Sequence, residues 1–343
     1  MPNQLVCSGP DTIAWAKYDL PGKLEPGQIR IRNTHGAEKQ GTMAAFVHGH
    51  GNKRGQWDAA KQMFVPGGIA WNYPIPLGNM QVGVVEEIGN KVTKYEAGDR
   101  LLYFGGFAPS AVLNEKAGWK LGATTSWKTA TCLDPATYAF CALQDGKVQI
   151  GQAVAIFSLG AIGLMAVQLA KRAGCHPIIA IDPLANRRAV ALATGADLAI
   201  DPIGTDVGQA LREATGWRGV DVVIEYSGSL EAIQASLRGV AFGGNIVLGG
   251  FPSPMKAGLD LGAEAHMNRP HIMFSRSESE PHREHPRWSH ARIHTTIHRM
   301  IVEGLIDGDL IVTPVIKFGD NLVTEYDRVS AIPEKTIKLG VEY

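Results

Sequence analysis

The chain has 343 residues, of which 45% are hydrophobic and 19% are charged, a composition typical of a globular protein. Its 33 basic residues balance its 33 acidic residues. A balanced charge argues against nucleic acid or an anionic membrane as the main partner, because both attract clustered positive charge. The length predicts two domains of ordinary size, and the charge favours a small-molecule substrate.

The first part of the chain, residues 1–135, is predicted to be β-rich. It contains many Gly and Pro residues, and hydrophobic and polar residues alternate over 27–35, 80–89 and 98–107. Alternation with a period of two, between turn residues, is typical of half-buried strands. We therefore expect a partly open barrel or sandwich in this part.

From Val148 onward, short apolar runs alternate with helical patterns. Runs that are apolar on both faces, separated by amphipathic helices, are typical of a parallel sheet covered by helices. The predicted fold class is therefore α/β, with a doubly wound nucleotide-binding domain at 136–290 whose last strand covers 271–277. A helix at about 288–305 precedes a strand-like tail, and residues 291–343 are expected to rejoin the first domain.

A glycine-containing turn follows the first apolar run and leads into a helix. It reads Ser158-Leu159-Gly160-Ala161-Ile162-Gly163, which is the dinucleotide-binding pattern GxGxxG with serine at the first position. Gly160 would let the backbone approach a pyrophosphate, and Gly163 would let the helix pack closely on the strand. The N–H groups at the helix start, at Ala161 and Ile162, would bind the phosphates.

The second apolar run ends at Asp182, whose carboxylate can accept both hydroxyls of an adenosine ribose and repel a 2′-phosphate. This position favours NAD over NADP as the cofactor. Arg187 and Arg188 follow, and they either contact the ribose or adenine or partly compensate a 2′-phosphate. The alternative is that Asp182 only caps a helix. Three residues after later strands complete the expected cofactor site: Ser227, Gly249 and Ser275.

The order of these parts resembles the medium-chain dehydrogenase/reductase superfamily, in which a GroES-like domain is interrupted by a Rossmann domain. The resemblance spans nearly the whole chain. It is carried by Gln40-Gly41-Thr42, 76–101, 133–143, 158–163 and 304–320. It implies a GroES-like catalytic domain at 1–135 and 291–343 and an oxidoreductase with a nicotinamide cofactor. It also implies that the strand 271–277 pairs across a two-fold axis in a homodimer or homotetramer.

The chain departs from the family at the metal positions. Zinc-dependent members carry Cys where this chain has Gln40, His-Glu where it has Asn79-Met80, and Cys or Glu where it has Asp134. Zinc prefers thiolate, imidazole and carboxylate ligands, and one carboxylate cannot hold it alone. We therefore expect a zinc-independent member with no metal site.

Without a metal, another group must accept the hydroxyl proton as the hydride leaves. By the resemblance, Thr42 replaces the Ser or Thr that relays this proton. Gln40, Asn79 and Asp134 would line the vacated metal pocket, with Asp134 as the expected base, unless these three only hydrogen-bond one another. Three further residues are either alternative proton carriers or solvated loop residues: Lys39, His48 and His50.

Three functions remain open from the sequence. The first is an NAD-dependent dehydrogenase that oxidises a secondary hydroxyl of a sugar-like, cyclitol or polyol substrate. The second is a quinone or enoyl reductase of the same superfamily, a class that usually prefers NADPH and is therefore disfavoured by Asp182. The third is a dinucleotide-binding sensor without catalysis.

Seven of the eleven histidines fall between His266 and His298. His290, His294 and His298 are four residues apart and would share one helix face. They could form a metal-binding stripe. The stretch could instead shape the mouth of the cleft, or form a solvated basic surface.

Four cysteines lie far apart with no CxxC pair, which predicts reduced and mostly buried thiols and no structural zinc lobe: Cys7, Cys132, Cys141 and Cys175. No stretch approaches the roughly 18 apolar residues of a membrane helix, and the start lacks a basic region followed by an apolar run. We therefore expect a cytoplasmic protein.

Overall fold

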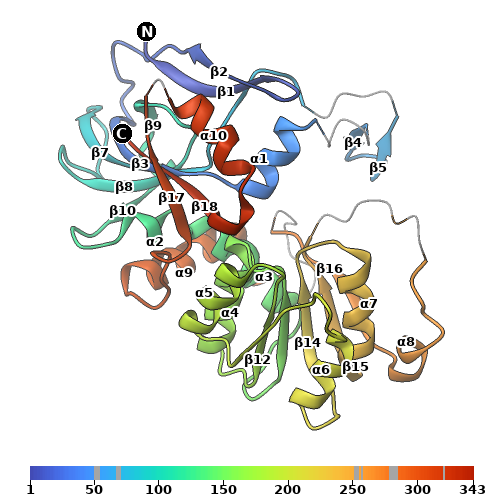
Figure 1. Cartoon of the computed structure of the whole chain (residues 1–343). Coiled ribbons are helices and arrows are strands. Elements are labelled where there is room, and N and C mark those ends of the chain that lie inside the picture. Colours follow the sequence, from blue (N-terminus) through green and yellow to red (C-terminus); the bar gives the residue numbers. More distant parts are fainter. Residues whose placement is uncertain (50–54, 67–70, 251–254, 256–257, 278–284, 320) are drawn as a thin grey trace. The chain divides into compact units, whose positions relative to one another are not determined.

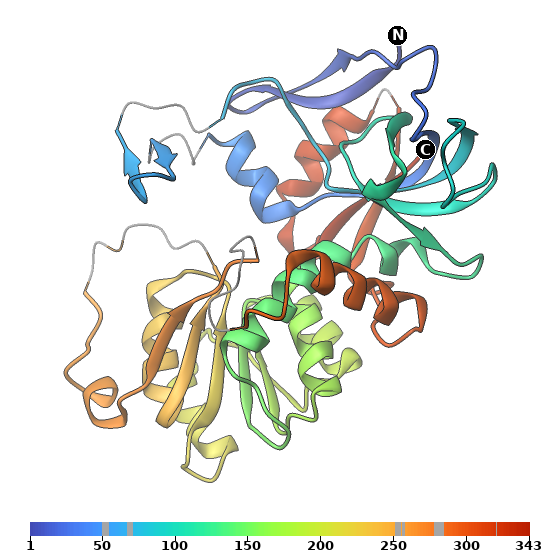
Figure 2. The ribbon, with the colours of Figure 1, turned by 180° about the vertical axis from the view of Figure 1, so that it is seen from behind.

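The computed structural model describes residues 1–343 except 50–54, 67–70, 251–254, 256–257, 278–284 and 320. The chain forms two compact units (Figures 1 and 2). Unit 1 contains Met1–Thr131 and Val312–Tyr343, and unit 2 contains Cys132–Ile311. Unit 1 is β-rich and unit 2 holds a parallel sheet with helices, so the predicted α/β fold class is confirmed.

Unit 1 is built on a seven-stranded sheet with the order β10-β8-β7-β3-β18-β17, in which β9 also pairs with β3. Its strands are β3 (Gln28–Ala37), β7 (Met80–Ile88), β8 (Arg100–Phe104), β9 (Ser110–Asn114), β10 (Gly118–Leu121), β17 (Val312–Lys317) and β18 (Lys338–Glu342). A second sheet has the order β2-β1-β6, with β1 (Asn3–Gly9), β2 (Thr12–Lys17) and β6 (Ile75–Pro76). The strands expected from alternation at 27–35, 80–89 and 98–107 correspond to β3, β7 and β8.

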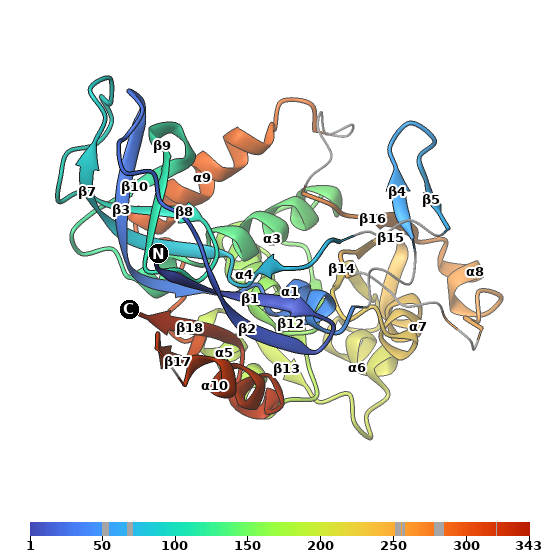
Figure 3. The same ribbon diagram turned by 90° about the horizontal axis from the view of Figure 1, so that it is seen from above.

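Unit 1 also contains a separate hairpin of β4 (Gln56–Asp58) and β5 (Met63–Val65) and the helices α1 (Gln40–Val47), α2 (Trp127–Ala130) and α10 (Leu322–Ser330). Helix α10 lies beside β17 and β18 (Figure 3). One apolar core joins α1 and α10 to β1 and β18, through Met43, Val47, Leu322 and Leu339. This core fixes α1 within unit 1.

Unit 2 is built on a six-stranded sheet with the order β13-β12-β11-β14-β15-β16, in which all neighbouring strands are parallel. The strands are β11 (Val154–Phe157), β12 (Ile178–Ile181), β13 (Leu198–Ile200), β14 (Val220–Glu225), β15 (Val240–Leu248) and β16 (His271–Phe274). The strand order reverses at β11, and such a switch point is where doubly wound folds bind ligands.

Helices cover both faces of this sheet. They are α3 (Leu133–Asp145), α4 (Ala161–Arg172), α5 (Ala185–Thr194), α6 (Val207–Ala214), α7 (Leu230–Gly239), α8 (Glu264–Asn268) and α9 (His290–Val302). Alternate strand residues such as Ala155 and Phe157 pack with Leu211 of α6 and Ile233 of α7 in one core. The intervening strand residues are also buried, which explains why the apolar runs show no alternation in the sequence.

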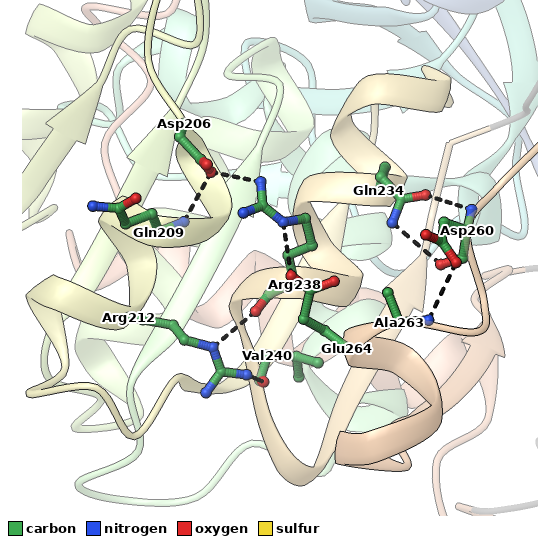
Figure 4. A network of polar contacts seen from close by, with 9 residues as sticks. All are labelled: Asp206, Gln209, Arg212, Gln234, Arg238, Val240, Asp260, Ala263 and Glu264. Atoms are coloured by element: carbon green, nitrogen blue, oxygen red, sulfur yellow. Dashed lines mark hydrogen bonds and ion pairs between the residues drawn. The ribbon is translucent and has the colours of Figure 1, made fainter.

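The connection from β15 to β16 is attached to neighbouring helices by a polar network (Figure 4). Arg238 on α7 donates to Asp206, the N-cap of α6, at 2.7 Å and to Glu264 of α8 at 3.1 Å. The amide of Gln234 contacts the backbone of Asp260 in both directions. These contacts hold α8 against α7 and so define the path of the chain toward β16.

The domain boundaries differ from the expected division at 135/136 and 290/291. Helix α9, which we expected to begin the return to the first domain, belongs to unit 2 because it packs on α3. Trp288 contacts Phe140 of α3 with ring centroids 5.0 Å apart, and His285 hydrogen-bonds the Gln144 carbonyl at 2.8 Å. The tail rejoins unit 1 only from Val312 onward.

All four cysteines are buried free thiols, as predicted. Among the described residues, no helix combines the length and the hydropathy needed to cross a membrane.

Candidate cofactor and active sites

The predicted cofactor motif forms the turn between β11 and α4. Ser158 has a φ of +69°, in the left-handed region where a non-glycine residue is strained. This conformation explains why glycine is usual at the first position of the motif. A Cβ at Gly163 would lie 2.0 Å from the Ser158 carbonyl oxygen, so only glycine allows α4 to approach the turn this closely.

Gly160 is the N-cap of α4 and has extended backbone angles that any residue can adopt. A Cβ at Gly160 would meet no heavy atom of the described chain within 4 Å. The glycine is therefore not required by packing, and the open space beside it suits the close approach of a ligand. Gly160 has no side chain to cap the helix, so the first N–H groups of α4, beginning at Ala161 and Ile162, remain suited to phosphate oxygens.

Asp182 follows β12 and is only 3% exposed. Its carboxylate accepts hydrogen bonds from Leu159 N at 2.7 Å and Leu184 N at 2.8 Å. It therefore connects the glycine turn to the segment before α5. The N-cap of α5 is Leu184, so Asp182 does not cap that helix directly.

Both arginines after Asp182 are held close to it. One guanidinium nitrogen of Arg187 lies 3.8 Å from an Asp182 carboxylate oxygen. Arg188 donates to the carbonyls of Asp182 and Pro183 and forms an ion pair with Asp201 at 3.0 Å. Arg188 would have to leave these partners before its guanidinium could compensate the charge of a 2′-phosphate.

The other expected cofactor residues follow the carboxyl ends of neighbouring parallel strands. Ser227 follows β14, the N–H of Gly249 donates to the Glu225 carbonyl at 2.9 Å, and the N–H of Ser275 donates to the Leu248 carbonyl at 3.1 Å. A Cβ at Gly249 would lie 2.5 Å from the Tyr226 ring, so glycine is required there. Carboxyl ends of adjacent parallel strands lie on one edge of the sheet, and the expected cofactor residues therefore share that edge.

Glu225, a buried carboxylate at the end of β14, was not predicted as a site residue. It accepts hydrogen bonds from the Ser227 hydroxyl, from Ser227 N and from Gly228 N. Burial raises the pKa of this carboxyl, and the Ser227 and Gly228 donors oppose the rise. The sequence signal that could have identified it is its position at the end of the run 220–224, shortly before the pair Ser227-Gly228.

The expected active-site residues of unit 1 lie at the junction of α1 and the main sheet. Gln40 begins α1, and Thr42 lies in its first turn with a half-buried side chain. Asn79 directly precedes β7, and its carbonyl accepts a hydrogen bond from Gly105 N at 2.9 Å. The antiparallel pairing of Ala37 with Met80 brings the chain before α1 beside Asn79. The register of β3 and β7 thus gathers the segments that carry these three residues.

Asp134 lies in unit 2, in the first turn of α3, and is 6% exposed. Among the described residues, no three His, Cys, Asp or Glu side chains form a group able to hold a metal ion.

The alternative proton carriers are distributed around α1. Lys39 is the N-cap of this helix. His48 is its C-cap, at the end away from Thr42, and its Nδ1 lies 2.6 Å from an Asp11 carboxylate oxygen. This position makes His48 a poor candidate. His50 lies outside the described residues.

Sequence reasoning also missed a buried charged cluster directly before α1. Glu38, Tyr326 and Lys338 are 1%, 3% and 2% exposed. The Tyr326 hydroxyl donates to the Glu38 carboxylate, and the Lys338 ammonium donates to the Glu38 carbonyl. The second carboxylate oxygen, Oε2, has no hydrogen-bond partner among the described residues. Burial raises the pKa of Glu38 to about 7, and Tyr326 and Lys338 limit the rise.

The histidine-rich stretch is partly described. His290 and His294 on α9 have ring centroids 4.3 Å apart, and Arg292 lies over the Trp288 ring at 4.0 Å. His282 and neighbouring residues at 278–284 lie outside the described part. Residues 285–292 pack on α3 in unit 2, so at least this portion has a structural role.

Comparisons with known proteins identify relatives of this chain. The family model for zinc-binding dehydrogenases matches residues 161–286. D-guloside 3-dehydrogenase of Escherichia coli (strain K12) is 37% identical over 350 residues, which cover 99% of this chain and 99% of the relative.

Two solved structures share the fold and hold different dinucleotides. One, described as a zinc-binding dehydrogenase of Sinorhizobium meliloti 1021 and bound to NADP, has a TM-score of 0.77 at 20% identity and covers 99% of both chains. The other is a short chain alcohol dehydrogenase of E. coli CFT073 complexed with NADH, with a TM-score of 0.77 at 18% identity, covering 100% of this chain and 99% of that one. At this identity, the two structures show only that the fold is shared. The relative that is 37% identical over its full length also shows the family. The chain therefore belongs to the zinc-binding dehydrogenase family of the medium-chain dehydrogenase/reductase superfamily.

Proposed function

We propose that this protein is an NAD(H)-dependent dehydrogenase that oxidises a secondary hydroxyl of a sugar-like, cyclitol or polyol substrate, or reduces the matching ketone, without zinc. The observation that carries this proposal is the 37% identity, over the whole chain, to D-guloside 3-dehydrogenase. A glycoside with a free ring hydroxyl is therefore the substrate class that we favour.

The residues of unit 2 fit a dinucleotide. The open space at Gly160 and the uncapped start of α4 would receive the pyrophosphate. Asp182 would accept the hydroxyls of the adenosine ribose, since each carboxylate oxygen can accept a hydrogen bond besides the one that it holds. A 2′-phosphate at this carboxylate would be repelled, which supports NAD over NADP.

The residues at the metal positions do not fit catalytic zinc. Neutral amide oxygens such as those of Gln40 and Asn79 are weak donors to Zn²⁺, and Asp134 is the one anionic group at these three positions. We therefore assign no step of the reaction to a metal.

Oxidation of a secondary alcohol removes a hydride from the carbon and a proton from the hydroxyl oxygen. The bound dinucleotide supplies the hydride acceptor. We assign the relay of this proton to the Thr42 hydroxyl and the role of base to Asp134. The amides of Gln40 and Asn79 would hydrogen-bond the substrate hydroxyl and the carbonyl that it becomes.

We also propose that the active form is a homodimer or a tetramer of dimers. Strand β16 is the edge of the parallel sheet, and it presents Ile272 and Phe274, which are 48% and 73% exposed. An apolar edge strand is a template for pairing with a second copy. Light scattering on the purified protein tests this proposal, and a monomer at micromolar concentration would refute it.

The function is tested by the reduction of NAD⁺ with D-gulosides, free sugars, cyclitols and polyols, using protein purified without chelator and analysed for metal. We expect turnover with at least one hydroxylated substrate and no dependence on zinc. Stoichiometric zinc that is needed for turnover would overturn the metal-free assignment. NADPH-dependent reduction of quinones or enones, without alcohol oxidation, would favour the reductase class.

The assigned proton carriers are tested by Thr42→Val and Asp134→Asn. Each should lower kcat about 100-fold or more while the affinity for NADH stays unchanged. Asp145→Asn is the matched control, because Asp145 is another buried acid of α3. An equal loss of kcat in all three variants would indicate a general effect on folding and contradict the assignment.

A further inference from the structure

Glu225 joins the two turns that follow β14 and β15. Its backbone carbonyl accepts hydrogen bonds from Gly249 N at 2.9 Å and Gly250 N at 3.1 Å, both in the turn after β15. Its carboxylate accepts hydrogen bonds from the Ser227 hydroxyl and from Gly228 N, the latter at 2.9 Å, both in the turn after β14. A Cβ on Gly250 would lie 3.1 Å from Gly228 N, so the two turns also pack directly on each other.

The carboxylate of Glu225 also determines how the chain leaves β14 for α7. The residue is 1% exposed, so its oxygens must find their hydrogen bonds within the protein. The Ser227 hydroxyl donates to Glu225 and accepts from the N–H of Ser229, the N-cap of α7, at 3.1 Å. A carboxylate only accepts hydrogen bonds, whereas a carboxamide would direct an N–H group at one of these N–H or O–H donors. The turn after β14 therefore requires an acidic side chain at this position.

The two turns lie on the side of the switch point that does not carry Asp182. A doubly wound fold binds the two mononucleotide halves of a dinucleotide on either side of the point where the strand order reverses. The order reverses at β11, and Asp182, the expected ligand of the adenosine ribose, follows β12 on one side. The other side starts with the adjacent strands β14 and β15 (Figure 1). Glu225 itself is paired with Phe157, the residue before the glycine turn. The turns that Glu225 joins thus belong to the side expected for the nicotinamide half.

We propose that Glu225 is a positioning residue for the nicotinamide half of the cofactor. Its carboxylate holds the turn after β14, and through it the turn after β15, in the shape that receives this half, without touching the cofactor. Glu225 thus acts through Ser227 and Gly249, the expected contact residues of these turns. The inference rests on the dinucleotide binding of the proposed function and on no particular hydroxylated substrate.

The test is calorimetric titration with NADH and with ADP, which keeps the adenosine and both phosphates but lacks the nicotinamide riboside. In the wild type, NADH should bind about tenfold or more tightly than ADP. Glu225→Gln should weaken NADH binding about tenfold, while the Kd for ADP changes by less than about twofold. A general loss of stability would not produce this split between the two ligands.

Asp221→Asn is the matched control. Asp221 is an acid near the other end of the same strand, and it also accepts a backbone hydrogen bond, from Ala153 N at 2.8 Å. Both Kd values should stay unchanged in this variant. Glu225→Asp keeps the charge but withdraws it by one methylene group. If Glu225→Gln does not fold, Glu225→Asp decides, with NADH binding about threefold weaker and ADP binding unchanged as the expected result.

The outcomes separate this inference from the proposed function. If the protein oxidises a hydroxylated substrate with NAD⁺ and the variants at Glu225 bind NADH as the wild type does, the inference is refuted and the proposed function stands. If no such substrate is oxidised but NADH binding alone weakens in these variants, the inference stands and the substrate class fails. An equal weakening of NADH and ADP binding overturns the inference. A wild type that does not bind NADH overturns both the inference and the cofactor assignment.

Discussion

The buried carboxyl of Glu38 makes a specific prediction for the pH dependence of stability. The substitution Glu38→Gln replaces an ionisable group with a neutral amide of the same shape. The amide oxygen can still accept the hydrogen bond from Tyr326. Glu38 is 1% exposed, so solvent screens its environment little.

The sign and size of the effect follow from the raised pKa. Glu38 has a pKa of about 7 in the folded chain against 4.5 for an ordinary Glu. Its contribution to stability is therefore fully present below pH 4.5 and is lost as the pH rises through about 7. A change of this size corresponds to about 3 kcal/mol in the free energy of unfolding, at about 1.4 kcal/mol per pKa unit. Glu38→Gln should match the wild type near pH 4.5 and exceed its stability by about 3 kcal/mol at pH 8.

The assay is urea unfolding of both proteins at several values between pH 4.5 and 8, followed by circular dichroism. Glu325→Gln is the control, because Glu325 lies on the same α10 as Tyr326 and Arg328 lowers the pKa of its carboxyl, the opposite direction to that of Glu38. Tyr326→Phe removes a hydrogen bond that lowers the Glu38 pKa in the folded chain, and the loss of stability should then continue to a higher pH. Parallel curves for the wild type and Glu38→Gln would refute the reasoning.

The remaining predictions concern the cofactor turn. Gly160→Ala should keep the wild-type melting temperature but bind NADH about tenfold or more weakly, since its Cβ enters open space. Gly163→Ala should lower both the melting temperature and the NADH affinity. Equal melting temperatures for the two variants would contradict the packing argument. Ser158→Gly should raise stability by about 1 kcal/mol in thermal unfolding, because glycine relieves the positive φ, and an unchanged melting temperature would argue against strain there. Asp182→Asn should raise the KM for NAD far more than that for NADP, and an equal effect on both would remove the ribose assignment.

The sequence predicted the strands of both units well, because their patterns depend on local burial. The runs that became β11, β12 and β14 are buried on both faces. Strand β3 alternates between more and less buried residues, whereas β7 is mostly buried up to Val85 and exposed after it. The partner of α9 could not be predicted. The spacing of Ile293, Ile297 and Ile301 indicates an apolar face, but periodicity does not say which surface that face covers.

The candidate sites were predictable to different degrees. The glycine turn was predictable because its glycine spacing is a recurring local motif: Gly163 is required by its packing on Ser158, and Gly160 leaves open space at the start of the helix. Glu38 was not predictable, since its burial depends on Tyr326 and Lys338, which follow it by nearly the whole chain. In the sequence, Ser158 is only a departure from the glycine motif. Its positive φ in the structure shows that the backbone at this position is strained.

The strand order of unit 1 has a consequence for how the protein is made. Strand β18 lies between β3 and β17, and the hydroxyl of Tyr343 donates to Gln81 at 2.8 Å and accepts from Ala108 N at 3.1 Å. A growing polypeptide can complete the sheet of unit 2 as soon as Ile311 has emerged from the ribosome. The sheet formed by the first 131 residues must then wait for the last strand, and until it arrives the end of β3, at His35, Gly36 and Ala37, lacks its partner on that side. Chaperone dependence and aggregation during synthesis should therefore originate in unit 1, and shortening the chain by the few residues of β18 should harm yield far more than their number suggests.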